Sequence, residues 1–249
     1  MSQPIAIILA AGKGTRMKSD LPKVLFPVLD RPMVEFVIDA VKAAGVDRIL
    51  LVVGYRADEV KRQIGEDRHL TYVLQEQQLG TGHAVQVCRD ELVDHDGAVL
   101  VVTGDSPLLQ VSSVKSLLDR YESEDTACVL GTQHRNDPTG LGRIVRDENE
   151  QFVGIVEEKD TTDEQKRITE VNMSTYVFDC QQLLHALDRL KNDNQQGEYY
   201  ITDCPGIMLG EGANVQALPV LKPCEALSVN TLDQLKVVED EMRKMGYGS

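Results

Sequence analysis

Short apolar runs alternate with amphipathic segments along the first half of the 249-residue chain. The runs at 5–9, 49–53 and 98–102 are apolar at every position, which is typical of strands buried on both faces. The segments between them repeat apolar residues at helical spacing. A parallel sheet covered by helices on both sides produces this alternation, so the pattern predicts a doubly wound α/β fold.

Glycine and proline mark the ends of the predicted helices. Pro32 is expected in the first turn of a helix that closes at Gly45, and Gly65 closes a shorter, more polar helix. A short strand around 72–74 and a helix through 84–87 precede the third apolar run.

The spacing of the elements changes in the second half of the chain. Candidate strands at 127–130, 142–146 and 152–156 follow one another closely, and the polar cluster 147–150 is typical of a hairpin turn. We therefore expect a mixed sheet in which an antiparallel part is inserted.

Helical spacing returns near 181–190 and again at 232–245. The chain contains no internal repeat and no linker rich in Pro, Gly or Ser. We expect a single domain over 1–249, with one lobe at 1–126, a second at 127–230 and a C-terminal helix at 231–249.

The composition excludes some classes of function. With 40 acidic and 26 basic residues the chain carries a net charge of −14, which argues against non-specific nucleic-acid binding. The five cysteines lie too far apart for a zinc or redox motif and are typical of reduced cytosolic thiols. No leader pattern or apolar run of membrane length is present. We therefore expect a cytoplasmic protein with no nucleic-acid or membrane partner.

A glycine-rich segment at 9–18 follows the first apolar run and reverses the local charge. Lys13, Arg16, Lys18 and Lys23 stand close together against a single acid, Asp20. Glycines let backbone N–H groups approach an anion, so this segment predicts a polyphosphate site. The alternative without a binding function is a solvated turn after an edge strand.

Two common phosphate loops are excluded by spacing. A P-loop would need glycine where this chain has Ile7, and the dinucleotide fingerprint would need a small residue where it has Met17. The segment is therefore a different kind of phosphate loop.

Two polar residues are expected near the carboxyl ends of strands. Asp105 follows the apolar run that ends at Val102, where it could bind a divalent cation such as Mg²⁺. The alternative is a helix cap, although Ser112 lies closer to the start of the next helix. Asn230 follows 226–229 and, taken alone, is more typical of a helix N-cap.

The segment 75–84 offers two amides, Gln75 and Gln78, followed by a glycine turn into a helix. Amides can match the donor and acceptor edge of a pyrimidine. The alternative is a polar loop before a helix that Thr81 caps.

These segments resemble those of a known family. Residues 9–23 match the Leu-Ala-Ala-Gly-x-Gly-Thr-Arg-Met…Pro-Lys motif of the nucleotidyltransferases that activate sugar 1-phosphates. Residues 75–84 match the Gln-x-x-Gln-Leu-Gly-Thr-x-His-Ala segment of the bacterial N-acetylglucosamine-1-phosphate uridyltransferases. Further matches lie at 138–144, 155–160 and 197–203. The resemblance implies a Rossmann-like, doubly wound, mostly parallel mixed sheet of the nucleotide-diphospho-sugar transferase type.

The resemblance also implies roles for individual residues. Arg16 and Lys23 would be catalytic, and Asp105 and Asn230 would hold Mg²⁺. The implied nucleotide-binding residues are Leu9, Ala10, Ala11, Gly12, Gly14, Thr15, Gln75, Gln78, Gly80 and Thr81. The implied sugar-binding residues are Gly140, Glu157, Asn172, Tyr200 and Thr202. Read without the resemblance, Glu157 is a charged hairpin end and Asn172 a strand-edge amide.

The implied reaction joins UTP and N-acetylglucosamine 1-phosphate into UDP-N-acetylglucosamine and pyrophosphate. The alternatives are another acceptor such as glucose 1-phosphate, or a non-catalytic nucleotide-sugar sensor. A sensor would be expected to lack the metal Asp or the loop cations, and an interaction domain leaves the basic loop unexplained.

Two departures from the family leave the exact sugar open. Thr103 stands where the family usually has an aromatic residue, and Met173-Ser174 replaces Thr-Gly.

In the bacterial proteins of this family, the uridyltransferase half is commonly followed by a β-helix. That β-helix carries an acetyltransferase and makes the proteins trimers. The chain shows no hexapeptide repeats. We therefore expect no acetyl transfer from acetyl-CoA, and a monomer or weak dimer.

Overall fold

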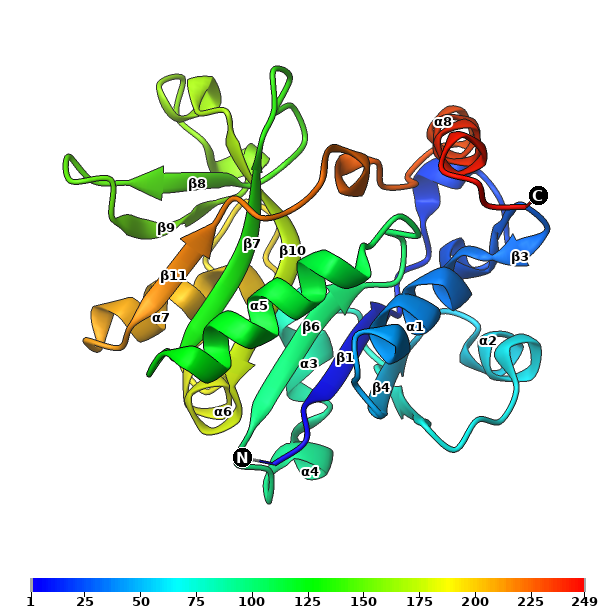
Figure 1. Ribbon diagram of the computed structural model, residues 1–249, viewed down its shortest axis with the longest axis horizontal. Helices are drawn as coiled ribbons and strands as arrows, with labels where there is room; N and C mark the ends of the chain where they lie inside the picture. The colour runs from blue at the N-terminus through cyan, green and yellow to red at the C-terminus, as the bar shows by residue number, and fades with distance from the viewer. Residues whose placement is uncertain (1, 249) are drawn as a thin grey trace.

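The computed structural model describes residues 2–248, and its centre is a mixed β-sheet (Figure 1). Within those residues nine strands form the sheet, in the order β11-β7-β10-β6-β1-β4-β5, with β8 paired to β10 and β9 paired to β8. The strands on the main path are β1 (Ile5–Ala10), β4 (Arg48–Val53), β5 (Leu70–Leu74), β6 (Ala98–Thr103), β7 (Cys128–His134), β10 (Glu170–Asp179) and β11 (Val215–Leu218). Only β10 among them runs antiparallel to its neighbours. The predicted mostly parallel, mixed α/β sheet is therefore confirmed.

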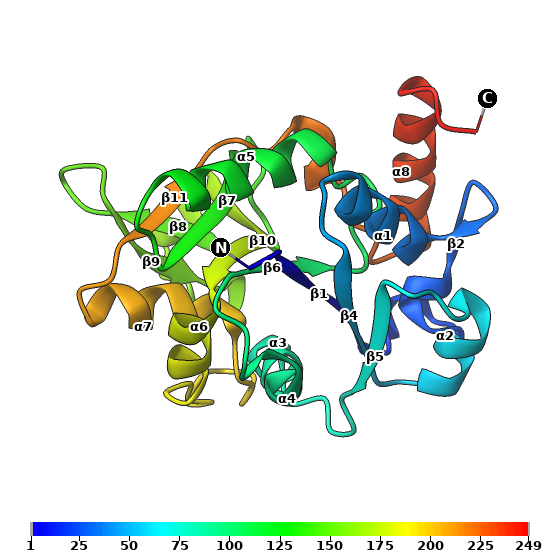
Figure 2. The same ribbon diagram turned by 60° about the horizontal axis from the view of Figure 1, so that its bottom comes forward.

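Helices cover both faces of the sheet, as Figure 2 shows. One face carries α1 (Met33–Ala43) and α5 (Val111–Ser123). The other carries α3 (Thr81–Gln86), α4 (Arg89–Leu92), α6 (Cys180–Leu187) and α7 (Cys204–Gly210). Alternate residues of β1 supply the two cores, with Ile7 in one and Ile8 in the other. This two-sided burial explains why the strand is apolar at every position.

A third, smaller core joins the C-terminal helix α8 (Leu232–Lys244) to the β2–β3 hairpin (Pro27–Val28 and Arg31–Pro32). Val238 and Met242 of α8 are fully buried against this hairpin and α1. The packing holds the segment before α8 beside the glycine-rich loop, because Met17 of that loop is buried in the same core.

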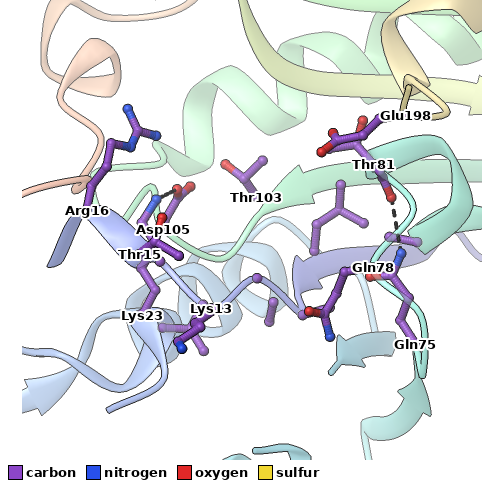
Figure 3. A pocket seen from close by; sticks show the side chains of 18 residues that line it. Lys13, Thr15, Arg16, Lys23, Gln75, Gln78, Thr81, Thr103, Asp105 and Glu198 are labelled. Carbon is purple, nitrogen blue, oxygen red and sulfur yellow. Dashed lines mark hydrogen bonds and ion pairs between the residues drawn. The ribbon is translucent and has the colours of Figure 1, made fainter. Parts of the chain in front are cut away.

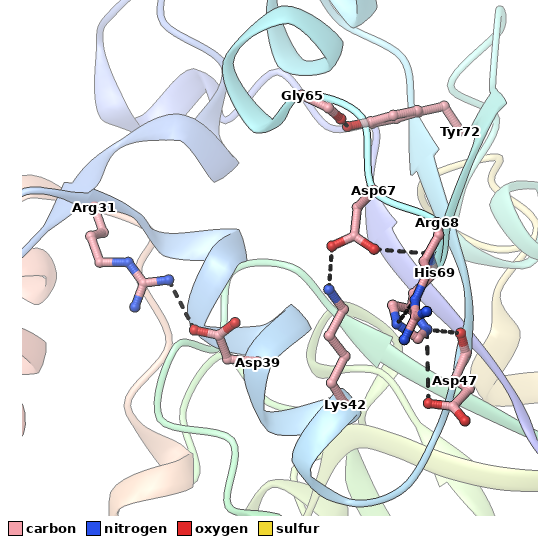
Figure 4. Close-up of polar contacts among 9 residues, drawn as sticks. All are labelled: Arg31, Asp39, Lys42, Asp47, Gly65, Asp67, Arg68, His69 and Tyr72. Carbon is pink, nitrogen blue, oxygen red and sulfur yellow. Dashed lines mark hydrogen bonds and ion pairs between the residues drawn. The ribbon is translucent and has the colours of Figure 1, made fainter.

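Polar contacts connect α1 with the edge of the sheet (Figure 4). Lys42 forms an ion pair with Asp67 at 2.5 Å and lowers the pKa of that carboxyl. The Tyr72 hydroxyl donates to the Gly65 carbonyl, which follows the short helix α2 (Ala57–Ile64). These contacts lie near the edge strand β5.

Most of the predicted elements are present. Gly45 follows α1 with a positive φ of 97°, and the turn between β8 (Arg143–Arg146) and β9 (Phe152–Val156) is closed by Asp147. Pro32 is different, because it belongs to β3 and precedes the first turn of α1.

Four of the strands that the structure describes were not predicted: β10, β11 and the hairpin strands β2 and β3. The predicted lobe boundary at 126 falls in the connection between α5 and β7. Among residues 2–248, no helix is both long and apolar enough to cross a membrane.

Candidate functional site

A cavity of about 430 Å³ opens at the carboxyl ends of β1 and β6 (Figure 3). All of the residues predicted to bind the nucleotide line it, together with Arg16, Lys23 and Asp105. Figure 3 shows the cations and Asp105 at one end and Gln75 and Gln78 at the other. The structure therefore assembles the predicted phosphate and base residues into one elongated site.

Gly14 shapes the end of the cavity that is predicted to bind phosphate. Its backbone is left-handed, with φ at 67°, and a Cβ placed there would lie 2.6 Å from Cβ of Lys23. Only glycine allows both this conformation and this close approach. The glycine-rich loop thus packs directly on the stem of Lys23.

Four side chains from distant segments converge on one point. The Lys23 ammonium forms an ion pair with the Asp105 carboxylate and donates to Oδ1 of Asn230 at 2.7 Å. Arg16 donates to the same Asn230 oxygen, also at 2.7 Å. The backbone adds a link, because the N–H of Val229 donates to the Asp105 carbonyl at 3.1 Å.

The two predicted metal ligands fit a small divalent cation. Asp105 and Asn230 both direct an oxygen at one positive charge, the Lys23 ammonium. One carboxylate and one amide oxygen suit Mg²⁺, which fills its remaining positions with water and phosphate oxygens. Residues 2–248 contain no cluster of three or more His, Cys, Asp or Glu that could hold a metal.

The helix-capping alternatives for Asp105 and Asn230 are not observed. Thr231 caps α8 by accepting from the backbone N–H of Gln234. Residues 227–229, which precede Asn230, form no strand.

Glu225, rather than Ser112, binds the start of α5. Its carboxylate accepts from the N–H of Gln110 at 3.0 Å and from the Ser113 hydroxyl at 2.6 Å. Burial raises the pKa of this carboxyl. Glu225 thereby connects the segment that carries Asn230 to the loop that carries Asp105.

At the end of the cavity that is predicted to bind the base, the side chains of Gln75 and Thr81 are fixed by hydrogen bonds. Gln75 is 3% exposed, and its Nε2 donates to the Gly80 carbonyl at 3.1 Å. Thr81 does not cap its helix, because its hydroxyl accepts from the backbone N–H of Ile201 at 3.1 Å.

Gly54, which packs against two residues of the cavity wall, was not predicted to contribute to the site. A Cβ there would lie 2.9 Å from both the Gln78 amide nitrogen and Ala11. Its position directly after the apolar run at 49–53 was the available signal.

The predicted sugar residues are not among the residues that line this cavity in the described part of the chain. The Thr202 hydroxyl donates to Glu157 at 3.0 Å, and burial raises the pKa of that carboxyl. Gly142 separates Glu157 from Asn172, which is buried and donates to the Tyr176 hydroxyl at 2.7 Å. Glu157 and Asn172 thus lie next to Gly142, and Thr202 is linked to them through Glu157.

The remaining two sugar candidates have different surroundings. The Tyr200 hydroxyl accepts from Gln196 at 2.6 Å. Gly140 lines a separate pocket of about 310 Å³, which also contains Arg16 and Asn230.

Arg143 was also missed. Its side chain is 2% exposed and forms an ion pair with Glu158 at 2.6 Å, and it donates to the Leu141 carbonyl. It therefore holds the 140–142 loop against the segment that carries Glu157. The sequence feature that could have identified Arg143 is its place in the glycine-rich segment 138–144, which matches the family.

Ser174 occupies a strained backbone position where the family has glycine. A bulge interrupts the pairing of β10 with β7 between Asn172 and Tyr176, and Ser174 adopts φ of 52°. We expect Ser174→Gly to raise the free energy of unfolding by roughly 0.5–1 kcal/mol, because glycine adopts this conformation without a Cβ clash. Thermal unfolding should show a rise in Tm of about 2 °C.

The matched control for Ser174→Gly is the same change at Ser112, which lies in α5. There glycine should lower stability by roughly 0.5 kcal/mol. A loss of stability at both positions would contradict the account of Ser174.

Asp203 carries a desolvated charge next to Thr202. Burial, with the neighbouring Asp160 and Asp193, raises its pKa from 3.8 to about 6. Above pH 6 the buried carboxylate is charged, which lowers the free energy of unfolding. Well below pH 4 the carboxyl is protonated in both the folded and the unfolded state, so this destabilisation disappears.

Asp203→Asn should therefore raise the free energy of unfolding by about 1 kcal/mol at pH 8, after allowance for solvent screening, and much less at pH 4.5. Urea unfolding at the two pH values measures this. Asp119→Asn on the exposed face of α5 is the control and should show no such pH-dependent gain. An equal gain from Asp203→Asn at both pH values would contradict the explanation.

Comparisons with known proteins show the family of this chain. Residues 6–196 match the MobA-like NTP transferase domain. The chain is 44% identical over 244 residues to the bifunctional protein GlmU of Brevibacillus brevis, which covers 98% of this chain and 52% of the relative. It is 41% identical to the GlmU of Bacillus subtilis over 244 residues, or 98% of this chain and 53% of the relative.

The chain thus spans about half the length of the curated relatives it matches. The predicted nucleotidyltransferase family is confirmed by the domain match and by these identities. The chain belongs to the MobA-like NTP transferase domain family.

Proposed function

We propose that this chain transfers a uridylyl group from UTP to N-acetylglucosamine 1-phosphate, forming UDP-N-acetylglucosamine and pyrophosphate. The main support is the Lys23 ammonium, which bonds Asp105 and Asn230 at the phosphate end of a cavity whose other end holds the Gln75 amide. The similarity to GlmU supports the same assignment.

The nucleotide would lie along the cavity. Its volume of about 430 Å³ falls in the usual range for small-ligand sites. The triphosphate would follow the glycine-rich loop, where the backbone at Gly12 and Gly14 is open to it. The base would meet Gln75 and Gln78 at the far end.

In the proposed reaction an oxygen of the sugar phosphate attacks the α-phosphorus of UTP. The bond from that phosphorus to the bridging oxygen breaks, and pyrophosphate leaves with the electron pair. Because the attacking group is already an anion, no general base is needed, and catalysis depends on alignment and charge neutralisation.

The chain's own cations would perform most of this neutralisation. Lys23 would contact the α-phosphate and the incoming sugar phosphate, and Arg16 would hold the β and γ groups. Both side chains now donate to Asn230, so binding would exchange these contacts for phosphate oxygens. Asp105 and Asn230 would hold Mg²⁺, which when bound supplies positive charge to the phosphate oxygens.

The sugar would bind beyond the phosphate end, between the Gly140 loop and the group around Gly142. Glu157, Asn172 and Thr202 would contact its hydroxyls, with Gly140 and Tyr200 at the rim. Met173 and Ser174 are half-buried at the bulge of β10, where a departure from the family sequence could alter the acceptor.

The test is pyrophosphate release from UTP in the presence of Mg²⁺ and a panel of sugar 1-phosphates. We expect N-acetylglucosamine 1-phosphate to give the highest kcat/KM, with glucose 1-phosphate and glucosamine 1-phosphate well below it. A preference for glucose 1-phosphate would overturn the proposed acceptor. No release with any acceptor would favour a nucleotide-sugar sensor.

A further inference from the structure

The Gln75 amide is held from two sides at the base end of the cavity. Its Nε2 lies 3.1 Å from the Gly80 carbonyl and 3.0 Å from Nδ1 of His83. A carbonyl oxygen can only accept a hydrogen bond, so the amide nitrogen must face Gly80. Its second N–H is then directed at His83.

This arrangement determines the tautomer of His83. The Gln75 nitrogen can only donate, so Nδ1 of His83 must accept, and the neutral imidazole carries its proton on Nε2. Both amide hydrogens are thus used inside the protein. Oε1 of Gln75 accepts no hydrogen bond from residues 2–248, so it is the polar atom that this side chain offers to the cavity.

We propose that His83 is a positioning residue for base selection: by accepting from Gln75 it keeps Oε1 toward the base as an acceptor. This inference rests on the proposed function, since it concerns the base of the nucleotide. Uracil has a ring N–H that can donate to such an acceptor. Cytosine has an unprotonated ring nitrogen at the same position, which would leave two acceptors facing each other.

The glycines next to His83 make the arrangement rigid. The N–H of Gly82 donates to the Tyr199 carbonyl at 2.7 Å, and the N–H of Tyr199 donates to the Leu79 carbonyl at 2.8 Å. The turn that carries Gly80 and the start of α3 that carries His83 are therefore held together. Gln75 in turn is anchored through its own N–H to the Val53 carbonyl at 2.8 Å.

The test compares variants at position 83 by their kcat/KM for UTP relative to CTP. His83→Leu and His83→Ala both remove the acceptor, and each should lower the ratio about tenfold, the scale of one lost hydrogen bond. The KM for UTP should rise while kcat stays within about twofold, because the phosphate end is unchanged. His83→Asn can present an oxygen near the Nδ1 position and should restore the ratio to within about threefold of the parent.

A double-mutant cycle separates positioning from a general structural effect. Adding His83→Leu to Gln75→Ala should change the ratio no further, because the positioned amide is already absent. His185→Leu on α6, where the imidazole pairs with Glu211 at the surface, is the matched control and should leave the ratio unchanged. An unchanged ratio in both acceptor-free variants, a His83→Asn variant as impaired as His83→Leu, or additive effects with Gln75→Ala would overturn the inference.

Binding keeps this inference separate from the proposed function. Calorimetric affinities of UTP and CTP for the same variants should show the same pattern without any turnover. A parent protein that binds UTP over CTP but releases no pyrophosphate would contradict the proposed reaction and leave the role of His83 measurable. A parent that binds both nucleotides equally would overturn the inference on His83.

Discussion

Asp105→Asn is expected to lower turnover by about a hundredfold or more while the protein stays folded. The substitution keeps the shape of the side chain and removes the negative charge that, in our proposal, holds Mg²⁺. Losses of this size are typical when one electrostatic stabiliser of a transition state is removed. The half-buried carboxylate pairs with Lys23 at the rim of the cavity rather than packing in the core, so little stability should be lost.

The measurement is kcat for pyrophosphate release at saturating Mg²⁺, with thermal unfolding as the check on folding. Asp39→Asn is the control, because Asp39 pairs with Arg31 at 2.9 Å (Figure 4) and is not among the residues that line the cavity in the described structure. Activity of Asp105→Asn within a few-fold of the parent would contradict the metal assignment.

Lys23→Ala and Arg16→Ala are expected to give different kinetic patterns. Charge on the transferring phosphoryl group is greatest in the transition state, so losing Lys23 should lower kcat, by about a hundredfold, more than it raises the KM for UTP. Arg16 would hold the β and γ groups, whose contacts change less. Arg16→Ala should therefore also raise the KM for UTP, by about tenfold.

Steady-state kinetics with varied UTP and saturating sugar phosphate distinguish the two patterns. Lys18→Ala is the matched control, since Lys18 is exposed in the same loop and is not among the residues that line the main cavity in the described structure. Identical effects of Lys23→Ala and Arg16→Ala on kcat and KM would argue against separate roles.

The phosphate end of the site was predictable because its signals are local in the sequence. The glycines, the cations from Lys13 to Lys23 and the carboxylate after a buried strand each indicate a role within a few residues. The parallel part of the sheet was predictable for the same reason, since strands buried on both faces are apolar throughout.

The features that were not predicted depend on tertiary contacts, which local sequence patterns do not specify. A bulge at Met173–Thr175 interrupts β10. The sequence of β10 therefore lacks the continuous apolar run that is typical of a central strand. Glu225 binds Gln110, which lies 115 positions earlier in the chain. The hydrogen bond from Gln75 to His83 depends on how the glycine turn folds back, which spacing alone does not specify.

The most direct test of the central claim is ³¹P NMR of UTP and N-acetylglucosamine 1-phosphate incubated with the protein and Mg²⁺. Our account predicts that the sugar phosphate signal and the triphosphate signals decay together. The two coupled resonances of UDP-N-acetylglucosamine and the single resonance of pyrophosphate should appear in equal molar amounts. UTP that stays intact, or that is hydrolysed while the sugar phosphate remains, would contradict uridylyl transfer at this site.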